Sequence, residues 1–367
     1  MEAGAKGCVL KASPGRTDDR PRPGSRIGTG QRWRDPGQTC RSPDRLIGSP
    51  TPWRPRRDDA RCRLAGSSDL NGYDANVRDE SNAIAGRTRL GNPANGNAAR
   101  PQGACRVLMI GDLIGKPGRV AVESILPELR DERSIDFVTA NGENVAGGMG
   151  LTPSTADSIL AAGVDVITSG NHIWDKREIY QYLESSERVL RPLNYGTHEV
   201  PGRGWGTYQA LDGTDLAVIN LQGRTYMQPI DNPFTDVDRL LDESSEPLPP
   251  VRLVDFHCEL TSEKNALGLY LDGRVSVVAG THTHIVTGDE RILPNGTAYQ
   301  TDLGMTGPIW SVIGFDPKTV IPRFLNALPT RFEVASGTVV FNALQVDIDP
   351  ATGRALAIER IQRLVEA

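Results

Sequence analysis

The chain has 367 residues, enough for one large domain or two ordinary ones, and a formal net charge of −5. The charge is uneven, because residues 1–103 hold 19 Lys and Arg against 11 Asp and Glu, whereas the other 264 residues hold 22 basic and 35 acidic ones. No apolar stretch approaches the roughly 20 residues that span a bilayer and no apolar signal core follows the first Met, so we expect a cytoplasmic protein that contacts no membrane.

Residues 1–103 are predicted to be a disordered basic extension. The segment is rich in Arg, Pro, Gly and Ser, as in "RPRPGSRIGTGQRWRDPG", and it lacks the apolar periodicity needed to bury a core. Three of the five cysteines fall in it, which argues against a disulfide framework and fits a reducing cytosol. Its positive charge could bind nucleic acid or anionic lipid, although a solvated extension, or an upstream start codon that leaves the segment without function, is the simpler interpretation. Residues 104–367 are predicted to form the folded domain.

The first half of this domain is predicted to alternate strands with helices. Apolar runs that end at glycine or polar loops indicate strands, and helical periodicity with capping residues indicates helices. Thr152 and Pro153 suit a helix start, and Asp175 with Glu178 resembles a capping box. The elements expected, in order, are a strand at 107–110, a helix at about 118–130, a strand within 136–144, a helix within 151–163, a strand within 164–172 and a helix at 176–185.

Strands predominate in the second half of the domain. Asp316 and Pro317 indicate the start of a helix that runs to about residue 326, and the turn "DPATG" joins the last two strands. The strands expected here lie at 216–221, 251–257, 275–284, 297–304, 337–348 and 354–364. Helices that alternate with strands early and strands that predominate later predict an α/β protein with layers packed around mixed sheets.

Polar side chains follow five of the predicted strands at the point where each ends. In α/β proteins the carboxyl ends of the strands form the edge at which ligands bind, so these side chains are expected to share one site. Four of the five histidines are among them, and only His198 lies elsewhere. The candidate residues are Asp112, Glu143, Asn144, Asn171, His172, His257, His282 and His284.

Each of these residues also has a simpler interpretation. Asp112 and Asn171 follow glycines and are typical of turns, and a single histidine such as His257 is more often a hydrogen-bonded structural residue than a ligand. The joint pattern favours the shared site. Imidazole, carboxylate and amide groups suit Fe, Mn, Zn or Mg rather than a thiolate site, and eight groups are too many for one tetrahedral ion. We therefore expect two metal ions, with His282 and His284 divided between them.

The motifs around these residues resemble those of the YmdB-like family of calcineurin-type metallophosphoesterases, bacterial phosphodiesterases that act on cyclic nucleotides. The seven matching segments are "GDLIGKPGR", "NGENVAGGMGLT", "DVITSGNHIWD", "RPLNY", "DFHCELTSEK", "GTHTHIVTGD" and "DLGMTG". They occur in order between residues 106 and about 365, whereas residues 1–103 have no counterpart. The resemblance implies a four-layer sandwich of two mixed β-sheets flanked by helices.

The resemblance also implies a role for each candidate residue. It assigns one metal to Asp112, Glu143, Asn144 and His284, and the other to Glu143, Asn171, His257 and His282, so that Glu143 bridges them. His172 is then the general acid rather than a ligand. Other metallophosphoesterases begin with Asp-x-His, which is Asp112-Leu113-Ile114 here, so Asn144 is expected to replace the missing histidine.

The resulting prediction is a dinuclear hydrolase of cyclic nucleotides, with 2′,3′-cyclic nucleotides favoured over 3′,5′-cyclic ones and other small phosphodiesters. The two cations, divalent or of mixed valence, would activate a water for attack on phosphorus, and His172 would protonate the leaving ribose oxygen. Fe or Mn is favoured, with Mg or Zn as alternatives. A homo-oligomer is compatible with the sequence. The alternative function is a regulatory protein that binds metal and nucleotide with little turnover, for which a general acid would serve no purpose.

Overall fold

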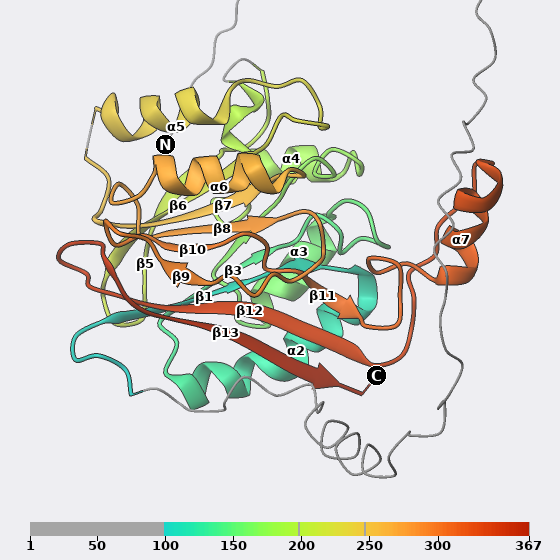
Figure 1. The fold of residues 1–367 in the computed structure, drawn as a ribbon, viewed down its shortest axis with the longest axis horizontal. Coiled ribbons are helices and arrows are strands. Elements are labelled where there is room, and N and C mark those ends of the chain that lie inside the picture. Colours follow the sequence, from blue (N-terminus) through green and yellow to red (C-terminus); the bar gives the residue numbers. More distant parts are fainter. Residues whose placement is uncertain (1–98, 197–198, 246, 367) are drawn as a thin grey trace, which may run out of the picture. The chain divides into compact units, whose positions relative to one another are not determined.

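The computed structural model describes residues 99–196, 199–245 and 247–366. They form two β-sheets packed face to face, with helices on the outer face of each (Figure 1). This arrangement confirms the predicted four-layer α/β sandwich of two mixed sheets. The extension predicted to be disordered falls outside the described residues except for 99–103, and His198 falls outside them as well. Within the described ranges, no helix combines the length and the apolarity that crossing a bilayer requires.

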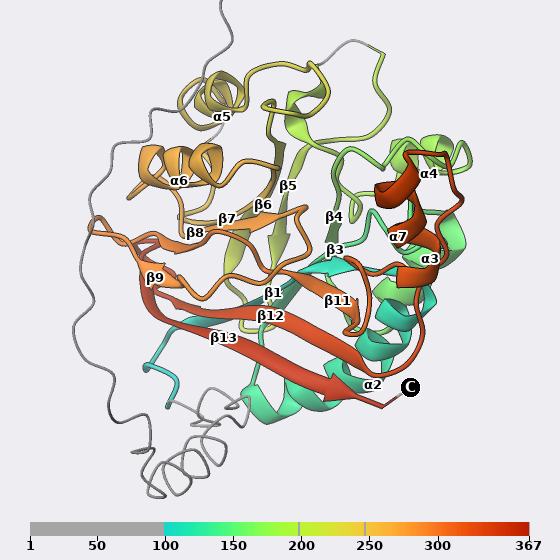
Figure 2. The ribbon, with the colours of Figure 1, turned by 45° about the vertical axis from the view of Figure 1, so that its right-hand side comes forward.

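The first sheet has seven strands and contains the start of the folded domain. β1 pairs in parallel with β3 on one side and antiparallel with β12 on the other, and β12 forms a long hairpin with β13. Its strands are β1 (Cys105–Ile110), β2 (Asp112–Leu113), β3 (Phe137–Asn141), β4 (Val166–Thr168), β11 (Met305–Pro308), β12 (Val339–Ile348) and β13 (Ala355–Val365). The helices packed with it are α2 (Gly115–Arg133), α3 (Pro153–Ala161) and α4 (Ile179–Ser185), as Figure 2 shows from a second direction.

The second sheet has six strands in the order β5-β6-β7-β8-β10-β9, and its central four are parallel. The strands are β5 (Trp205–Gln209), β6 (Asp215–Gln222), β7 (Val251–His257), β8 (Val277–Thr281), β9 (Arg291–Ile292) and β10 (Ala298–Gln300). Helices α5 (Pro233–Asp242) and α6 (Thr261–Tyr270) cover its outer face. The short 3₁₀ helix η1 (Leu193–Tyr195) precedes β5, and α7 (Pro317–Asn326) lies outside both helical layers (Figures 1 and 2).

Alternation along the strands divides the apolar side chains among three core regions. In β1, Leu108 and Ile110 pack toward the helices, whereas Val107 and Met109 pack against the second sheet. The same alternation places Ala217 of β6 in the core beneath α5 and α6. Because side chains of a strand alternate between its two faces, a strand buried on both faces needs the continuous apolar run that the sequence shows.

The starts of α3 and α4 can be compared with the helix caps predicted from the sequence. Thr152 caps α3 as predicted, with its hydroxyl accepting the backbone N–H of Thr155 and with Pro153 as the first helical residue. The capping box predicted for Asp175 and Glu178 is wrong, because α4 begins only at Ile179 and has no side-chain cap. The Asp175 carboxylate instead accepts a hydrogen bond from the His172 imidazole, the role that the sequence offered as the less favoured alternative to the cap.

Two helices in the second half were missed by the sequence analysis. α5 lies between β6 and β7, and α6 between β7 and β8. Both are crossover connections, which parallel neighbouring strands require because a tight turn can only reverse the chain. The crossovers bring the carboxyl ends of β6, β7 and β8 to one edge of their sheet, where the predicted site residues lie.

Candidate metal centre

All eight candidate residues meet where the carboxyl ends of the parallel strands of both sheets come together. Asp112 follows β1, Glu143 and Asn144 follow β3, Asn171 and His172 follow β4, His257 ends β7, and His282 and His284 follow β8. A continuous series of contacts joins them, from the Asp112 carboxylate through the His282 amide to the Glu143 carboxylate and the His172 amide. Residues up to 172 positions apart are thus brought together by the two sheets.

One group of donor atoms surrounds the ring of His257. Its Nε2 lies 3.0 Å from Glu143 Oε1, 3.1 Å from Asn171 Oδ1 and 2.9 Å from His282 Nδ1. One donor atom from each of Glu143, His257 and His282 lies within 4.8 Å of the others. The four side chains are buried or half-buried, so the group offers two imidazoles, a carboxylate and an amide oxygen to a single point.

A second group lies on the other side of Glu143 and contains Asp112, Asn144 and His284. The Asn144 amide nitrogen is 3.2 Å from His284 Nε2 and 3.3 Å from Glu143 Oε1. His284 Nε2 is also 3.9 Å from Asp112 Oδ1. That carboxylate oxygen is fully buried and accepts no hydrogen bond from the described residues, a costly state for an anionic oxygen unless a cation binds it. Glu143 belongs to both groups.

The three buried or half-buried imidazoles of these groups are each oriented by an acceptor on the far side of the ring. His257 Nδ1 is 3.0 Å from the Thr281 hydroxyl, His282 Nε2 is 3.0 Å from a Glu259 carboxylate oxygen, and His284 Nδ1 is 2.8 Å from the Ile313 carbonyl oxygen. An N–H that donates outward leaves the lone pair of the other ring nitrogen facing the centre. This is the arrangement in which metal-binding histidines are usually found.

The strand predicted at 275–284 is shorter than expected and does not include His282 and His284. β8 ends at Thr281, and the φ angles of His282 and His284 are 99° and 66°. Both residues occupy the left-handed region, which is strained for residues with a side chain. The two imidazoles therefore diverge, the first toward His257 and the second toward Asn144. The "H-x-H" spacing serves two separate groups of donors.

His172 belongs to neither group, although its backbone N–H donates to Glu143 Oε2 at 3.0 Å. Its Nδ1 lies 2.8 Å from Asp175 Oδ2, and its side chain is 31% exposed. Asp175 therefore orients the ring and favours a proton on Nδ1. His172 is the most accessible of the four histidines of the site that the structure describes.

Burial and close charges shift the pKa values of the ligand candidates. Burial raises the pKa of Asp112 to about 6. Burial also opposes charge on Glu143 and His257, but their mutual attraction prevails, so the pKa of Glu143 falls to about 2 and that of His257 rises to about 9. Burial and the neighbouring His257 lower the pKa of His282 to about 3. A cation would be attracted to the carboxylates and would compete with the proton on His257.

Further polar residues behind the centre were missed by the sequence analysis. Asp255 is buried in β7, where its carboxylate accepts hydrogen bonds from the hydroxyls of Thr281 and Thr168 and from the Asn141 amide. Thr281 in turn contacts His257 Nδ1. An acidic residue inside the apolar strand "VRLVDFH" is a signal of such a network, because a buried carboxylate needs hydrogen-bond donors. Glu259, which contacts His282 Nε2, was missed as well, because it lies after β7 and not inside an apolar strand.

The basic residues in the motifs differ in burial: Lys264 and Arg191 are buried, and Lys116 is exposed. Lys264 is buried in α6, where its Nζ lies 2.6 Å from Asp302 Oδ2. The same carboxylate oxygen accepts hydrogen bonds from the N–H and hydroxyl of Thr283, between the two histidines. Arg191 is also buried and donates to backbone carbonyls. These two cations support the structure near the site, whereas Lys116 is exposed.

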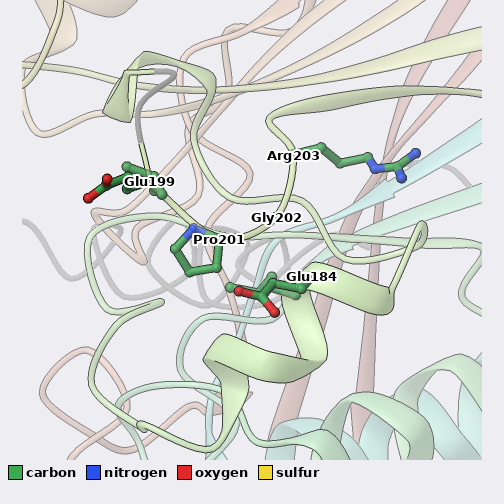
Figure 3. Close-up of a pocket in the computed structure, with 7 residues that line it drawn as sticks. Glu184, Glu199, Pro201, Gly202 and Arg203 are labelled. Carbon is green, nitrogen blue, oxygen red and sulfur yellow. The ribbon is translucent and has the colours of Figure 1, made fainter.

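The structure has a cavity beside the candidate centre and a larger one away from it. A cavity of about 440 Å³ opens beside the centre and is lined by Glu143, Asn144, His172, His282 and His284 together with apolar side chains. A cavity of about 650 Å³ lies between α4 and the segment before β5, and Figure 3 labels Glu184, Glu199, Pro201, Gly202 and Arg203 in it. None of the eight candidate residues lines this larger cavity, so we assign it no role in the chemistry.

Comparison of the sequence with known families finds a match to the YmdB-like protein family over residues 108–361. The 2′,3′-cyclic-nucleotide 2′-phosphodiesterase of Bacillus subtilis is 48% identical over 256 residues, which are 70% of this chain and 96% of that protein. A putative phosphatase/phosphodiesterase of Mycoplasma genitalium is 35% identical over 269 residues, 71% of this chain and 94% of that protein.

Solved structures with the same fold include two from bacteria. A hypothetical protein from Thermus thermophilus is 45% identical and superposes with a TM-score of 0.66 over 71% of this chain and 100% of its own. A novel phosphatase from Mycoplasma pneumoniae is 32% identical, with a TM-score of 0.67 over 72% of this chain and 94% of its own. The matched region is the folded domain that carries the candidate centre.

Proposed function

The chain belongs to the YmdB-like family, and from this premise we propose that it is a metal-dependent phosphodiesterase that opens 2′,3′-cyclic nucleotides. The observation that carries the proposal is the pair of donor groups that share Glu143. The name of the Bacillus subtilis relative supports the choice of substrate, since that protein is nearly half identical along almost its whole length. Cyclic nucleotides with a 3′,5′ linkage are the alternative substrates.

The donor atoms of this chain fit two cations. Asp112 Oδ1 is buried without a hydrogen-bond partner among the described residues, and the lone pairs of three oriented imidazoles face the two donor groups, two in one group and one in the other. Such a mixed set of nitrogen and oxygen donors suits a borderline or hard divalent metal. A thiolate site is not indicated, because the thiol of Cys258 contacts Leu260 and Glu263 instead of the centre.

We assign one cation to Asp112, Glu143, Asn144 and His284 and the other to Glu143, Asn171, His257 and His282. The position of Glu143 supports the bridging role, because its Oε1 lies between His257 Nε2 and the Asn144 amide. Binding through Asn144 requires its amide to present oxygen, a rotation about one side-chain bond. We favour Fe or Mn as the bound metal, with Mg or Zn as alternatives. The same donors can bind several of these ions, so metal availability decides which one occupies the site.

Two bound cations would neutralise phosphate charge and lower the pKa of a water to the neutral range. The side chains of the chain then perform three tasks. The ligand set would hold the cations, and with them the reacting phosphate, at the wall of the 440 Å³ cavity. His172, on the same wall, is free to give a proton to the ribose oxygen that leaves phosphorus. Asp175 accepts the Nδ1–H, so in the doubly protonated ring Nε2–H is the bond that breaks, and the Asp175 carboxylate balances the positive charge of the ring before transfer.

A regulatory protein that binds metal and nucleotide with little turnover remains a second interpretation of the ligand set alone. The pair of His172 and Asp175 argues against it, because a metal site needs no oriented imidazole outside its ligands. A cytosolic location is part of the proposal and rests on the distribution of the cysteines, three of which fall in residues 1–103.

Measurement of metal content and turnover on the purified protein tests the proposal. We expect about two metal ions per chain and hydrolysis of adenosine 2′,3′-cyclic phosphate, with slower turnover of the 3′,5′ isomer and loss of both after chelation. Protein that carries two ions yet hydrolyses none of these diesters, nor bis(p-nitrophenyl) phosphate, would overturn the proposal in favour of the regulatory interpretation. A panel with each metal added back identifies the active pair.

A further inference from the structure

The cavity beside the centre has a second wall that the proposed chemistry does not use. The donor residues line one part of the cavity, and most of the rest is lined by α7, by the turn before it and by a ring from the segment after it. The residues of this second wall, named the aromatic wall from here on, are Ile313, Phe315, Val320, Arg323, Phe324 and Phe332. A phosphodiester held at the donors therefore faces an apolar surface with a single cation in it.

Phe324 and Arg323 are exposed members of the aromatic wall. Phe324 lines the cavity, yet its side chain is 82% exposed, so its ring faces solvent. The Arg323 guanidinium lies 5.4 Å from the centre of the Phe332 ring and forms no ion pair with a described carboxylate. An exposed ring beside a cation with free N–H donors can bind a planar, polar, aromatic group by stacking and hydrogen bonding.

The aromatic wall is held at a fixed place relative to the donors. The turn before α7 supplies the Ile313 carbonyl that orients His284, at 2.8 Å from its Nδ1. The loop after Asn144 packs on the wall through Gly148, where an added Cβ would lie only 2.7 Å from a Phe315 ring carbon. Two contacts thus connect the ligands of one proposed cation to the wall, and the cavity of about 440 Å³ between them is in the range of small-molecule sites.

We propose that the aromatic wall binds the base of the nucleotide substrate, which stacks on Phe324 and accepts hydrogen bonds from Arg323. The inference rests on the proposed phosphodiesterase function, because a nucleotide whose phosphate lies at the donors places its base across the same cavity. Guanidinium forms paired hydrogen bonds with O6 and N7 of guanine, whereas adenine offers a donor in place of O6. The aromatic wall therefore favours guanosine 2′,3′-cyclic phosphate over the adenosine compound.

Phe324→Ala tests the stacking step, and Leu325→Ala is its matched control. Leu325 lies next in α7, is 81% exposed and does not line the cavity. We expect Phe324→Ala to raise KM for guanosine 2′,3′-cyclic phosphate roughly 5- to 150-fold relative to KM for the base-less ribose 2′,3′-cyclic phosphate, the range for loss of one base–aromatic stack. Leu325→Ala should leave that ratio as in the wild type. Equal ratios in both variants and wild type would overturn the proposal.

Arg323→Lys tests the hydrogen-bonding step, because lysine keeps the charge but lacks the paired donors. Wild type should prefer the guanosine to the adenosine compound at least about fivefold in kcat/KM, and Arg323→Lys should lose this preference. Calorimetry with guanosine and adenosine gives a second readout that needs no turnover, and the same order of Kd is expected. A wild type without base preference in both assays would overturn the role of Arg323.

The two proposals fail in distinguishable ways. If wild type hydrolyses neither the nucleotides nor the base-less compound, the phosphodiesterase function fails. If it hydrolyses all three with equal kcat/KM, the function stands and the base site fails. If Phe324→Ala and Leu325→Ala instead both change the oligomeric state in solution while the KM ratio stays constant, α7 is an interface between copies of the chain and the base-binding role is wrong.

Discussion

Each histidine of the centre has one ring nitrogen that points away from the donor groups, and the hydrogen-bond partner of that nitrogen differs from one histidine to the next. His257, His282 and His284 meet a hydroxyl, a carboxylate and a backbone carbonyl, and each turns its other nitrogen inward. His172 meets Asp175 and turns its other nitrogen toward the cavity. In all four histidines a hydrogen bond to the outer nitrogen fixes the tautomer, so the assignment to ligand or proton donor rests on where the other nitrogen lies, within a donor group or at the cavity.

Replacement of one histidine of each kind separates these roles. His284→Ala should lose metal and activity together, with partial recovery in excess metal, because a ligand is missing. His172→Ala should keep both metals and slow turnover of cyclic nucleotides by roughly 10²–10⁴-fold, the usual contribution of a general acid. Bis(p-nitrophenyl) phosphate, whose leaving group needs little protonation, should be affected less. If His172→Ala loses metal or is equally impaired on both substrates, the general-acid assignment is wrong.

Asp175 is a positioning residue in this scheme, and Asp175→Asn should lower kcat about 10- to 100-fold with KM and metal content little changed. The cause is loss of the carboxylate that orients His172 at 2.8 Å. The deficit should again shrink for bis(p-nitrophenyl) phosphate. Glu178→Gln is the control, since Glu178 is exposed and provides no side-chain cap to α4. A drop in thermal stability without a kcat effect would mean that Asp175 has only a structural role.

At the scale of elements, the loop between β3 and α3 requires glycine at position 148 more strictly than at position 147. Gly148 has φ 98°, and a Cβ there would meet both Phe315 and Val334 at 2.7–2.9 Å. Gly147 has φ 74°, and a Cβ there would meet no atom within 4 Å. Both substitutions by alanine strain the backbone, but only the first one also displaces the aromatic wall.

We therefore expect Gly148→Ala to lower the free energy of unfolding by about 1–3 kcal/mol more than Gly147→Ala, the usual cost of overpacking. The cyclic-nucleotide activity of Gly148→Ala should also fall, because the loop carries Glu143 and Asn144 to the centre. Urea unfolding of both variants measures the difference. Equal unfolding free energies would show that the contact with Phe315 does not constrain the loop.

The ion pair between α6 and the segment after β10 is a second constraint on the centre. Lys264 and Asp302 are each 1% exposed, and Asp302 also accepts hydrogen bonds from Thr283 between the two histidines. Lys264→Met should cost about 3–5 kcal/mol of unfolding free energy, because it leaves a buried carboxylate without its cation. Lys318→Met, at an exposed lysine of α7, should stay within about 0.5 kcal/mol of wild type. Chemical denaturation that finds the two alike would refute this role.

At the scale of the whole molecule, the described contacts of the folded domain begin at Arg100. Its guanidinium binds the carbonyl oxygen of Ala104 and lies 2.5 Å from the Asp136 carboxylate. A chain of residues 99–367 should therefore keep its metal content and a melting temperature within about 2 °C of the full chain, which corresponds to less than about 1 kcal/mol. A chain that starts at Cys105 lacks this pair and should melt lower. Insolubility of the 99–367 chain would contradict the predicted domain boundary.

The sequence by itself determined the class of the fold and the candidate residues of the site. Short apolar runs between turn residues indicate strands buried on both faces, and the carboxyl ends of such strands form the edge at which an α/β protein binds ligands. Those two local facts were enough to select Asp112, Glu143, His257 and the other candidate residues. The motifs around them were specific enough to predict the family, which the comparisons confirm.

Only the tertiary structure decided how the candidates divide into groups and what lies opposite them. The separation of His282 from His284 depends on positive φ angles after β8, and the orientation of His284 depends on a carbonyl 29 positions away. Asp175 had two competing local roles, and the imidazole of His172 prevailed over the helix end. The aromatic wall comes from α7 and its flanking segments, far from the motifs of the first sheet. Contacts between distant segments leave no periodic signal in the sequence, because they arise when the two sheets pack together.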